Sequence, residues 1–270
     1  MEIIKYAFFQ KAIIACLLSG IICGIIGVWI IVMRISFIGV ALSHASFAGA
    51  LFAILINKST HFFSILFSLI TSSVLGPFSE KTQLHPETST GIMFSLTLGL
   101  AFLFLGLIPE GKSQALNYMW GSILTVENLD IYFLLILTFL ISILTILFFK
   151  EIKALLFNKE LAKAFGIHST IFYYLLFYLI GLSICGILKT VGGLLLYALI
   201  VNPASASYQI TYNLKKMYFL SVLFAILSTI TGLIFSTIFN TPTSATMVIT
   251  SSFIFCLCFL FSPKRKIRNE

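Results

Sequence analysis

The sequence predicts an all-α protein, a polytopic bundle of eight or nine membrane-spanning helices. Of its 270 residues, 59% are apolar and only 10% are charged, whereas soluble domains are ~45–50% apolar and ~25% charged. The apolar runs fill the whole chain, and the ~10-residue alternating segments of a membrane β-barrel are not seen. We therefore expect one domain over residues 1–270 with lipid as its surroundings. Despite the net charge of +8, a soluble enzyme or a partner of nucleic acid is excluded.

Apolar windows of about 20 residues, bounded by charge, proline or polar clusters, mark the spans in chain order. The first is too long for the core of a signal peptide and is expected to stay in the membrane. The seventh is interrupted by Gly192, Gly193 and Pro203 and is expected to be broken or re-entrant. The nine windows are 12–33, 37–56, 62–78, 88–108, 131–149, 169–188, 191–207, 217–239 and 244–262.

The basic residues predict the orientation, because cytoplasmic loops of membrane proteins retain Lys and Arg. Four of them, Lys264, Arg265, Lys266 and Arg268, follow the last window, so the C-terminus is predicted to be cytoplasmic. Alternating backwards through nine spans leaves only five of the seventeen basic residues outside, and it places the N-terminus outside. These five are Lys5, Lys11, Lys58, Lys112 and Lys189.

The segment from Gly106 to Ser113 fits the phosphate-loop pattern G-x-x-x-x-G-K-S letter for letter. That motif requires a strand before it and a helix after it in an aqueous α/β domain. Here the segment ends an apolar run, and Glu110 occupies the place where phosphate would bind. We therefore predict that the chain is not an enzyme, has no nucleotide site of its own, and relies on another chain for any ATP.

His44 is the clearest ionisable residue within a predicted span. Such residues cost ~2.5–3.5 kcal/mol on insertion scales and are functional candidates by default. Beside it, Ala41, Ala45 and Gly49 recur every four residues and predict a small-residue face on which another helix packs closely. Two interpretations stay open: a histidine hydrogen-bonded to a neighbouring helix, or a metal ligand or gate, since imidazole is a common metal ligand.

Two further polar residues lie close to the spans. Glu87 follows Pro86 at the start of the fourth window, where the helix dipole stabilises a carboxylate, so a helix-start role is favoured over a place in a translocation path. Asn202, directly before Pro203, puts an amide at membrane depth. This is tolerated only where a cavity or another helix accepts it.

The longest inner loop predicts a two-turn helix outside the bilayer, with Asn158 as its N-cap and Gly166 as its C-cap. Phe157, Leu161 and Phe165 are spaced four apart and form an apolar ridge. The ridge is suited either to the groove of a partner protein or to lipid headgroups. We expect docking to a partner.

Four segments, in order and spacing, resemble the permease subunits of bacterial ATP-binding-cassette importers for zinc, manganese and iron. They are 34–49, 156–166, the run VGGLLLYALIVNPA at 191–204, and Thr-Pro-Thr at 241–243. The resemblance covers nearly the whole chain. It implies a multi-pass protein of the bacterial cytoplasmic (inner) membrane without a permanently bound cofactor. It also implies three kinds of partner: cytoplasmic ATPase subunits, an extracytoplasmic metal-binding protein, and a second, identical or sister, permease protomer.

The resemblance also implies residue roles. The second span lines the translocation path, with His44 as the histidine of the family. Many similar permeases have an aspartate four residues earlier, whereas this chain has Val40; Ser43, Glu87, Asn202 or His44 of a second protomer are the candidates to complete the site. Asn158 to Gly166 is the coupling helix. The residues that couple to the ATPase are Phe157, Asn158, Glu160, Leu161, Phe165 and Gly166.

Three other functions are alternatives to metal import. An ion-coupled secondary transporter needs titratable groups within the membrane, and His44 has no carboxylate in its own span. A cassette permease for a metal chelate such as a siderophore needs a wide, aromatic path, whereas Ala, Ser and Gly surround His44. A non-transporting membrane scaffold gives no role to a histidine within a span such as His44. We expect passage of a divalent cation, Zn, Mn or Fe, by alternating access, with no covalent chemistry.

Overall fold

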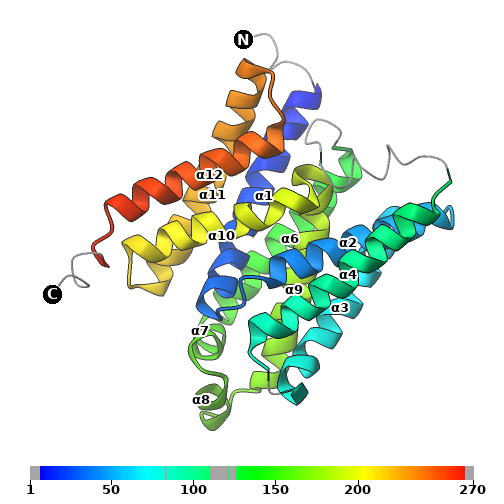
Figure 1. The fold of residues 1–270 in the computed structure, drawn as a ribbon. Coiled ribbons are helices and arrows are strands. Elements are labelled where there is room, and N and C mark those ends of the chain that lie inside the picture. The colour runs from blue at the N-terminus through cyan, green and yellow to red at the C-terminus, as the bar shows by residue number, and fades with distance from the viewer. Residues whose placement is uncertain (1–6, 83, 110–120, 122–125, 265–270) are drawn as a thin grey trace.

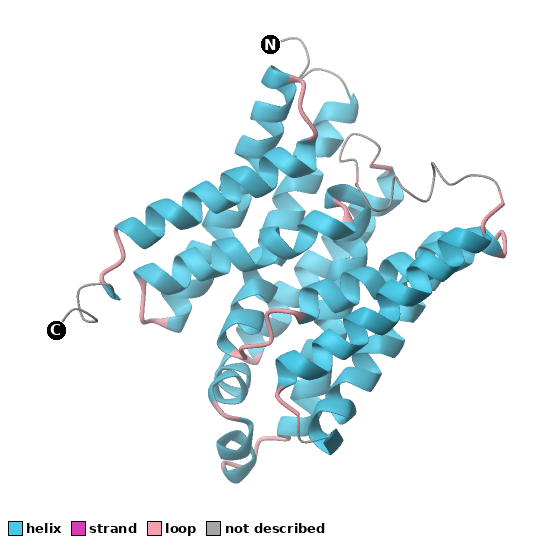
Figure 2. Cartoon of the chain, viewed as in Figure 1, coloured by secondary structure: helices cyan, strands magenta, loops and turns pink. Residues whose placement is uncertain are grey.

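The computed structural model describes residues 7–82, 84–109, 121 and 126–264. Over these residues the chain forms eleven helices and no strand (Figure 2). The all-α fold class predicted from composition and hydropathy is therefore confirmed. Helices prevail because a helix satisfies its backbone hydrogen bonds within itself, as lipid requires.

Eight helices are long and apolar enough to cross a membrane. They coincide with eight of the nine windows, within a few residues at each end. They are α1 (Ala7–Val32), α2 (Ile38–Leu55), α3 (Thr60–Thr82), α4 (Pro86–Leu107), α6 (Asn128–Leu147), α9 (Ser169–Val191), α11 (Leu214–Phe239) and α12 (Thr243–Leu260).

The seventh window forms α10 (Gly193–Ile210), which is helical but is not among those eight. Its break lies at its start. Gly192 has a φ of +87°, a conformation that glycine adopts readily and other residues rarely, and the chain changes there from α9 to α10. Pro203 lies inside α10, so the proline does not end the helix.

Close backbone approach at glycines holds α1 against α11. A Cβ atom added to Gly24 would lie 2.5 Å from the Val222 Cα atom, so no larger residue fits without a shift. The Ser221 hydroxyl donates to the carbonyl oxygen of Gly24 at 2.7 Å. Gly27 similarly faces Ile200 of α10. These contacts use the small residues and short hydroxyl side chains on which helix association in lipid depends.

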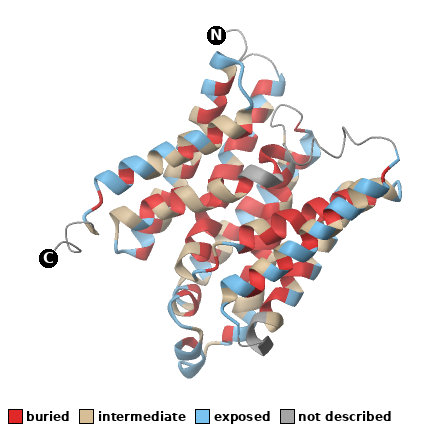
Figure 3. Ribbon diagram, in the orientation of Figure 1, coloured by how far each residue is buried: buried red, intermediate tan, exposed pale blue. Residues whose placement is uncertain are grey.

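The α2 helix lies between α3 and α4 and is the most enclosed of the eight spans, with 78% of its window buried (Figures 1 and 3). The α3 helix in turn packs on α9, where the Ser68 hydroxyl donates to the Gly181 carbonyl oxygen at 2.9 Å. The second span is therefore an interior helix, enclosed by protein over most of its length.

Two short helices, α7 (Phe149–Phe157) and α8 (Lys159–Ala164), lie together at one end of the bundle (Figure 1). The sequence predicted α8 but not α7, since the fifth window was expected to run to residue 149. Instead α6 ends at Leu147, and α7 buries Ile152, Leu155 and Leu156 on one face. Phe157 is the last residue of α7, and the two-turn helix follows from its N-cap at Asn158, where the sequence predicts it.

Candidate functional site

His44 lies in α2 with only 8% of its surface exposed. Its Nδ1 atom is buried and has no hydrogen-bond partner among the described residues. The imidazole meets the ring of Phe94 from α4 edge to face, with 5.1 Å between centroids. An unpartnered buried polar atom costs ~1–3 kcal/mol, and such atoms in native proteins call for an explanation such as an ion, a water or a function. Through Nδ1, His44 is therefore not tied to a neighbouring helix in the described part of the chain.

The surroundings of His44 on α2 are small and hydroxylated. Ser43 is fully buried, and its hydroxyl donates to the carbonyl oxygen of Val40 at 2.9 Å. Two residues after His44, the Ser46 hydroxyl donates to the carbonyl oxygen of Ser64 on α3 at 3.3 Å. Val40 itself is half-buried, one turn before His44. This stretch thus offers one imidazole, hydroxyl oxygens and backbone carbonyls.

The small residues predicted to pack against another helix are all buried, but they face two helices. The carbonyl oxygen of Ala41 accepts a hydrogen bond from Thr97 of α4 at 3.4 Å. Gly49 lies against the backbone of Phe63 on α3. Each step of four residues rotates the position by about 40° around a helix, so the row through Ala45 moves from one neighbour to the other.

Glu87 is exposed at the start of α4. The N-cap is His85, whose Nδ1 atom accepts from the Glu87 amide at 3.5 Å. Phe94, which contacts His44, lies seven residues further along α4, or about 10 Å along the axis. The structure therefore places Glu87 at the end of the helix, away from His44.

Asn202 joins α10 to α12. Its amide nitrogen donates to the Ser251 hydroxyl at 3.1 Å and to the Ser252 hydroxyl at 2.9 Å. A polar group at membrane depth is expected to need a hydrogen-bond partner, and here a neighbouring helix, α12, supplies it. The amide nitrogen of Asn202 is thus bound to α12, and the described residues show no hydrogen bond between Asn202 and His44.

Replacing Asn202 by alanine is expected to destabilise the protein modestly. The change removes two interhelical hydrogen bonds, and such bonds within membranes contribute ~0.6 kcal/mol on average, so we expect a loss of about 1 kcal/mol. Thermal unfolding of the purified chain in detergent measures it. Ser205→Ala is the matched control, because this hydroxyl on the same helix forms no hydrogen bond with the described residues. Equal thermal unfolding midpoints for the two variants would contradict a stabilising contribution of the hydrogen bonds between Asn202 and α12.

The short α8 helix is capped at both ends as its sequence predicts. The Asn158 side-chain oxygen accepts from the amides of Glu160 at 2.9 Å and Leu161 at 3.0 Å. At the other end Gly166 has a φ of +78°, and its amide donates to the Lys163 carbonyl oxygen at 3.0 Å. The amide of Ile167 donates to Ala162 at 3.1 Å. This pair of bonds is a Schellman motif, which ends the helix at a defined point.

The apolar ridge of Phe157, Leu161 and Phe165 points away from the rest of the chain. Their exposed fractions are 67%, 57% and 79%, while Ala162, about 100° around α8 from Leu161, is fully buried. Figure 3 shows the exposed surface at this end of the bundle. Large exposed apolar groups that cluster on a surface mark sites of interaction with a protein or a membrane.

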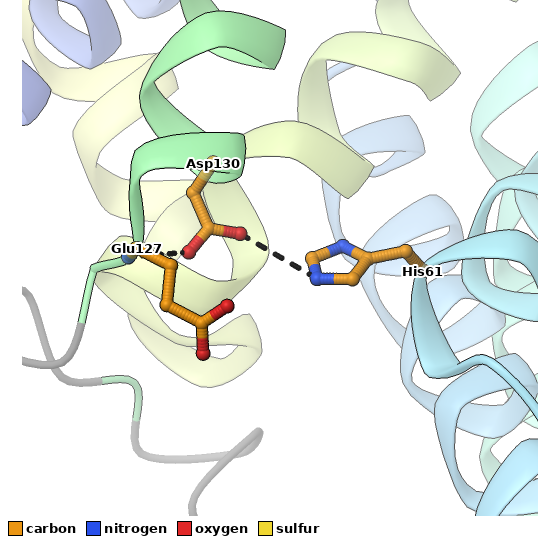
Figure 4. A network of polar contacts seen from close by, with 3 residues as sticks. All are labelled: His61, Glu127 and Asp130. Carbon is orange, nitrogen blue, oxygen red and sulfur yellow. Dashed lines mark hydrogen bonds and ion pairs between the residues drawn. The ribbon is translucent and has the colours of Figure 1, made fainter.

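A polar network between α3 and α6 was not found from the sequence (Figure 4). The Asp130 carboxylate is 3.5 Å from the Nε2 atom of His61, and it accepts from the Glu127 amide at 2.8 Å. Glu127 and Asp130 form a capping box at the start of α6, and their three-residue spacing was a usable signal. The contact with His61 arises only when α3 and α6 are brought together.

The phosphate-loop-like segment begins inside a helix, because Gly106 belongs to the last turn of α4. A helix thus precedes it, where a nucleotide site of this kind requires a strand. The glutamate, lysine and serine at positions 110, 112 and 113 lie outside the described residues.

Comparison with known proteins gives matches along nearly the full length of the chain. Residues 5–262 match the family described as the ABC 3 transport family. The manganese transport system membrane protein MntC of Listeria monocytogenes is 31% identical over 263 residues, covering 97% of this chain and 94% of that protein. The protein of the same name from Halalkalibacterium halodurans is 29% identical over 266 residues, with coverages of 98% and 91%. A solved structure, PsaBC from Streptococcus pneumoniae in complex with Fab, aligns with a TM-score of 0.86 and 28% identity over 97% of this chain and 94% of the matched one.

Proposed function

Because the chain belongs to the ABC 3 transport family, we propose that it is the membrane permease of an ATP-binding-cassette importer for divalent metal ions, with manganese as the principal cargo. The near-full-length similarity to membrane proteins named for manganese transport carries this proposal. The multi-pass helical bundle is the architecture that such a role requires.

The driving force comes from ATPase subunits that bind the ridge on α8 and bind the ATP themselves. The ridge is apolar and exposed, which suits the groove of a partner protein. Both ends of α8 are fixed by side-chain and backbone caps. Such a helix can move as a unit and transmit a displacement of the ATPase to the spans through α7 and α9. The permease itself performs no covalent chemistry.

The C-terminus and the α7–α8 pair lie on the cytoplasmic side, and the N-terminus lies outside. The connection from α1 to α2 and the short helices α7 and α8 lie towards one end of the bundle, and the start of α1 lies at the other (Figure 1). Lysines on α7 and α8 mark the first end as cytoplasmic under the positive-inside rule. In this orientation α10 counts as a crossing, and the chain passes the inner membrane nine times as a single domain.

The cation passes along α2 and contacts His44. The described residues contain no group of three or more His, Cys, Asp or Glu side chains arranged to hold a metal. A cation that meets one imidazole and oxygen atoms such as those near Ser43 is bound weakly enough to leave again. A second permease protomer completes the path, and an extracytoplasmic metal-binding protein delivers the ion.

Reconstitution of the permease with its ATPase subunits and binding protein into proteoliposomes tests this function. We expect manganese to accumulate only when ATP is supplied on the ATPase side, and ionophores that collapse proton and sodium gradients to leave uptake unchanged. Zinc and iron, added as competitors, rank the cargoes. Uphill uptake by the permease alone, driven by a pH or sodium gradient, would instead establish a secondary transporter.

A further inference from the structure

A groove of about 530 Å³ lies between α1, α6 and α11. The groove lies near the ends of these helices that are next to α7. In the proposed orientation these ends are on the cytoplasmic side. Its wall is almost entirely apolar, and two of the lining side chains, Ile146 and Phe219, are 75% and 70% exposed, so the groove opens sideways towards lipid. The residues that line it include Ile21, Ile25, Ser142, Ile146, Phe219 and Val222.

A second hollow of about 510 Å³ adjoins this groove at the cytoplasmic end of the helices. Phe149 and Lys215 line both spaces, so the two share a wall. The lining of the second hollow contains more polar side chains than that of the groove, because Lys153, Tyr212 and Asn213 contribute to it. An apolar groove at membrane depth thus adjoins a hollow with two lysines at the membrane surface.

Two lysines that line this hollow have no acidic partner in the described part of the chain. Lys153 and Lys215 form no ion pair with the described residues. The Lys215 Nζ atom lies over the ring of Phe149, 5.6 Å from its centroid. The Lys264 ammonium lies nearby, 4.6 Å from the centroid of Tyr212, but it donates to the carbonyl oxygen of Tyr208 and does not line the hollow. Two lysines that line an open hollow without an ion-pair partner among the described residues favour an anionic ligand.

We propose that the two spaces together form a binding site for one anionic phospholipid of the cytoplasmic leaflet. An acyl chain occupies the groove, and the phosphate lies between Lys153 and Lys215. Basic pockets between membrane helices on the cytoplasmic side bind anionic headgroups in this way. From Lys215 to Val222 the helix rises about 10 Å, which keeps the groove within one leaflet of a ~30 Å hydrocarbon core.

The headgroup would lie beside the ridge that we assign to the ATPase, because Phe157 lines the second hollow and also belongs to the ridge. The site rests on the proposed orientation but not on the identity of the cargo. Failure of metal uptake and failure of lipid binding are therefore separate results.

Native mass spectrometry of the full complex tests the proposal, using nanodiscs with equal amounts of phosphatidylglycerol and phosphatidylcholine. We expect the wild type to retain phosphatidylglycerol selectively. In Lys153→Ala/Lys215→Ala this retention should fall roughly 10- to 30-fold, since each lysine near an anionic surface contributes about a factor of five. Lys150→Ala/Lys216→Ala removes the same charge from the same two helices at positions that line neither space, and it should retain the lipid.

A third variant tests the apolar part. Ser142→Phe fills the groove and should also reduce phosphatidylglycerol retention, with the cytoplasmic lysines intact. Equal retention of both lipids by the wild type, or equal retention by the two double variants, would overturn the proposal. So would efficient cross-linking of Ile146→Cys to another protein subunit, because the groove would then be covered by protein and not by lipid.

Discussion

Leu161→Asp is expected to release the ATPase subunits from the purified complex and to abolish ATP-dependent manganese uptake. Leu161 is the middle residue of the ridge and is 57% exposed in the isolated chain, so a carboxylate there does not disturb folding. On docking, however, it would become an unpaired charge in an apolar groove. Such a buried charge costs ~3–5 kcal/mol, which lowers the docking affinity by more than about 100-fold. Co-purification in detergent measures the release.

Lys163→Gln is the matched control for this variant. It lowers the net charge by the same single unit, at a position roughly 200° around α8 from Leu161, and Lys163 is also exposed. We expect the control to retain the ATPase and to transport manganese. Unchanged co-purification of Leu161→Asp would show that the ridge rests on lipid headgroups, which is the other interpretation of its exposed apolar side chains.

The spans were predictable because a long apolar run crosses the lipid and must form a helix there to satisfy its backbone hydrogen bonds. The caps of α8 were predictable for a different reason: Asn158 and Gly166 act through bonds within a few residues of themselves. The α7 helix was missed because apolar residues continue through Phe148, where α6 ends and α7 begins. A window of average hydropathy does not register a change of direction at a single residue.

Candidate residues were found in the sequence, but their surroundings were not. His44 was identified because a titratable group in a membrane span is costly. That its ring faces Phe94, and that Asn202 bonds to α12, depends on how helices cross. The contact of Asp130 with His61 likewise joins two helices that are distant in the sequence. Tertiary pairings of this kind have no local signature.

His44→Ala is expected to reduce manganese uptake by at least about tenfold, since even residues that only support a metal ligand contribute 10- to 100-fold to affinity or activity. The loss of packing against Phe94 is partly offset by removal of an unpartnered buried nitrogen, so the thermal midpoint should shift little. Uptake of radioactive manganese into proteoliposomes measures the first effect. Retained ATPase docking shows that the assembly is intact.

His85→Ala is the control, because this histidine is exposed at the start of α4 and lies outside the proposed path. Its uptake should match the wild type. The two interpretations of His44 within the path then separate by the direction of the change. If His44 is a ligand of the passing cation, His44→Ala should lose manganese uptake. If His44 is a gate, the same variant should let manganese leak through without ATP. Normal, ATP-dependent uptake by His44→Ala would place the residue outside the path altogether, and its buried nitrogen would then reflect packing of α2 against α4.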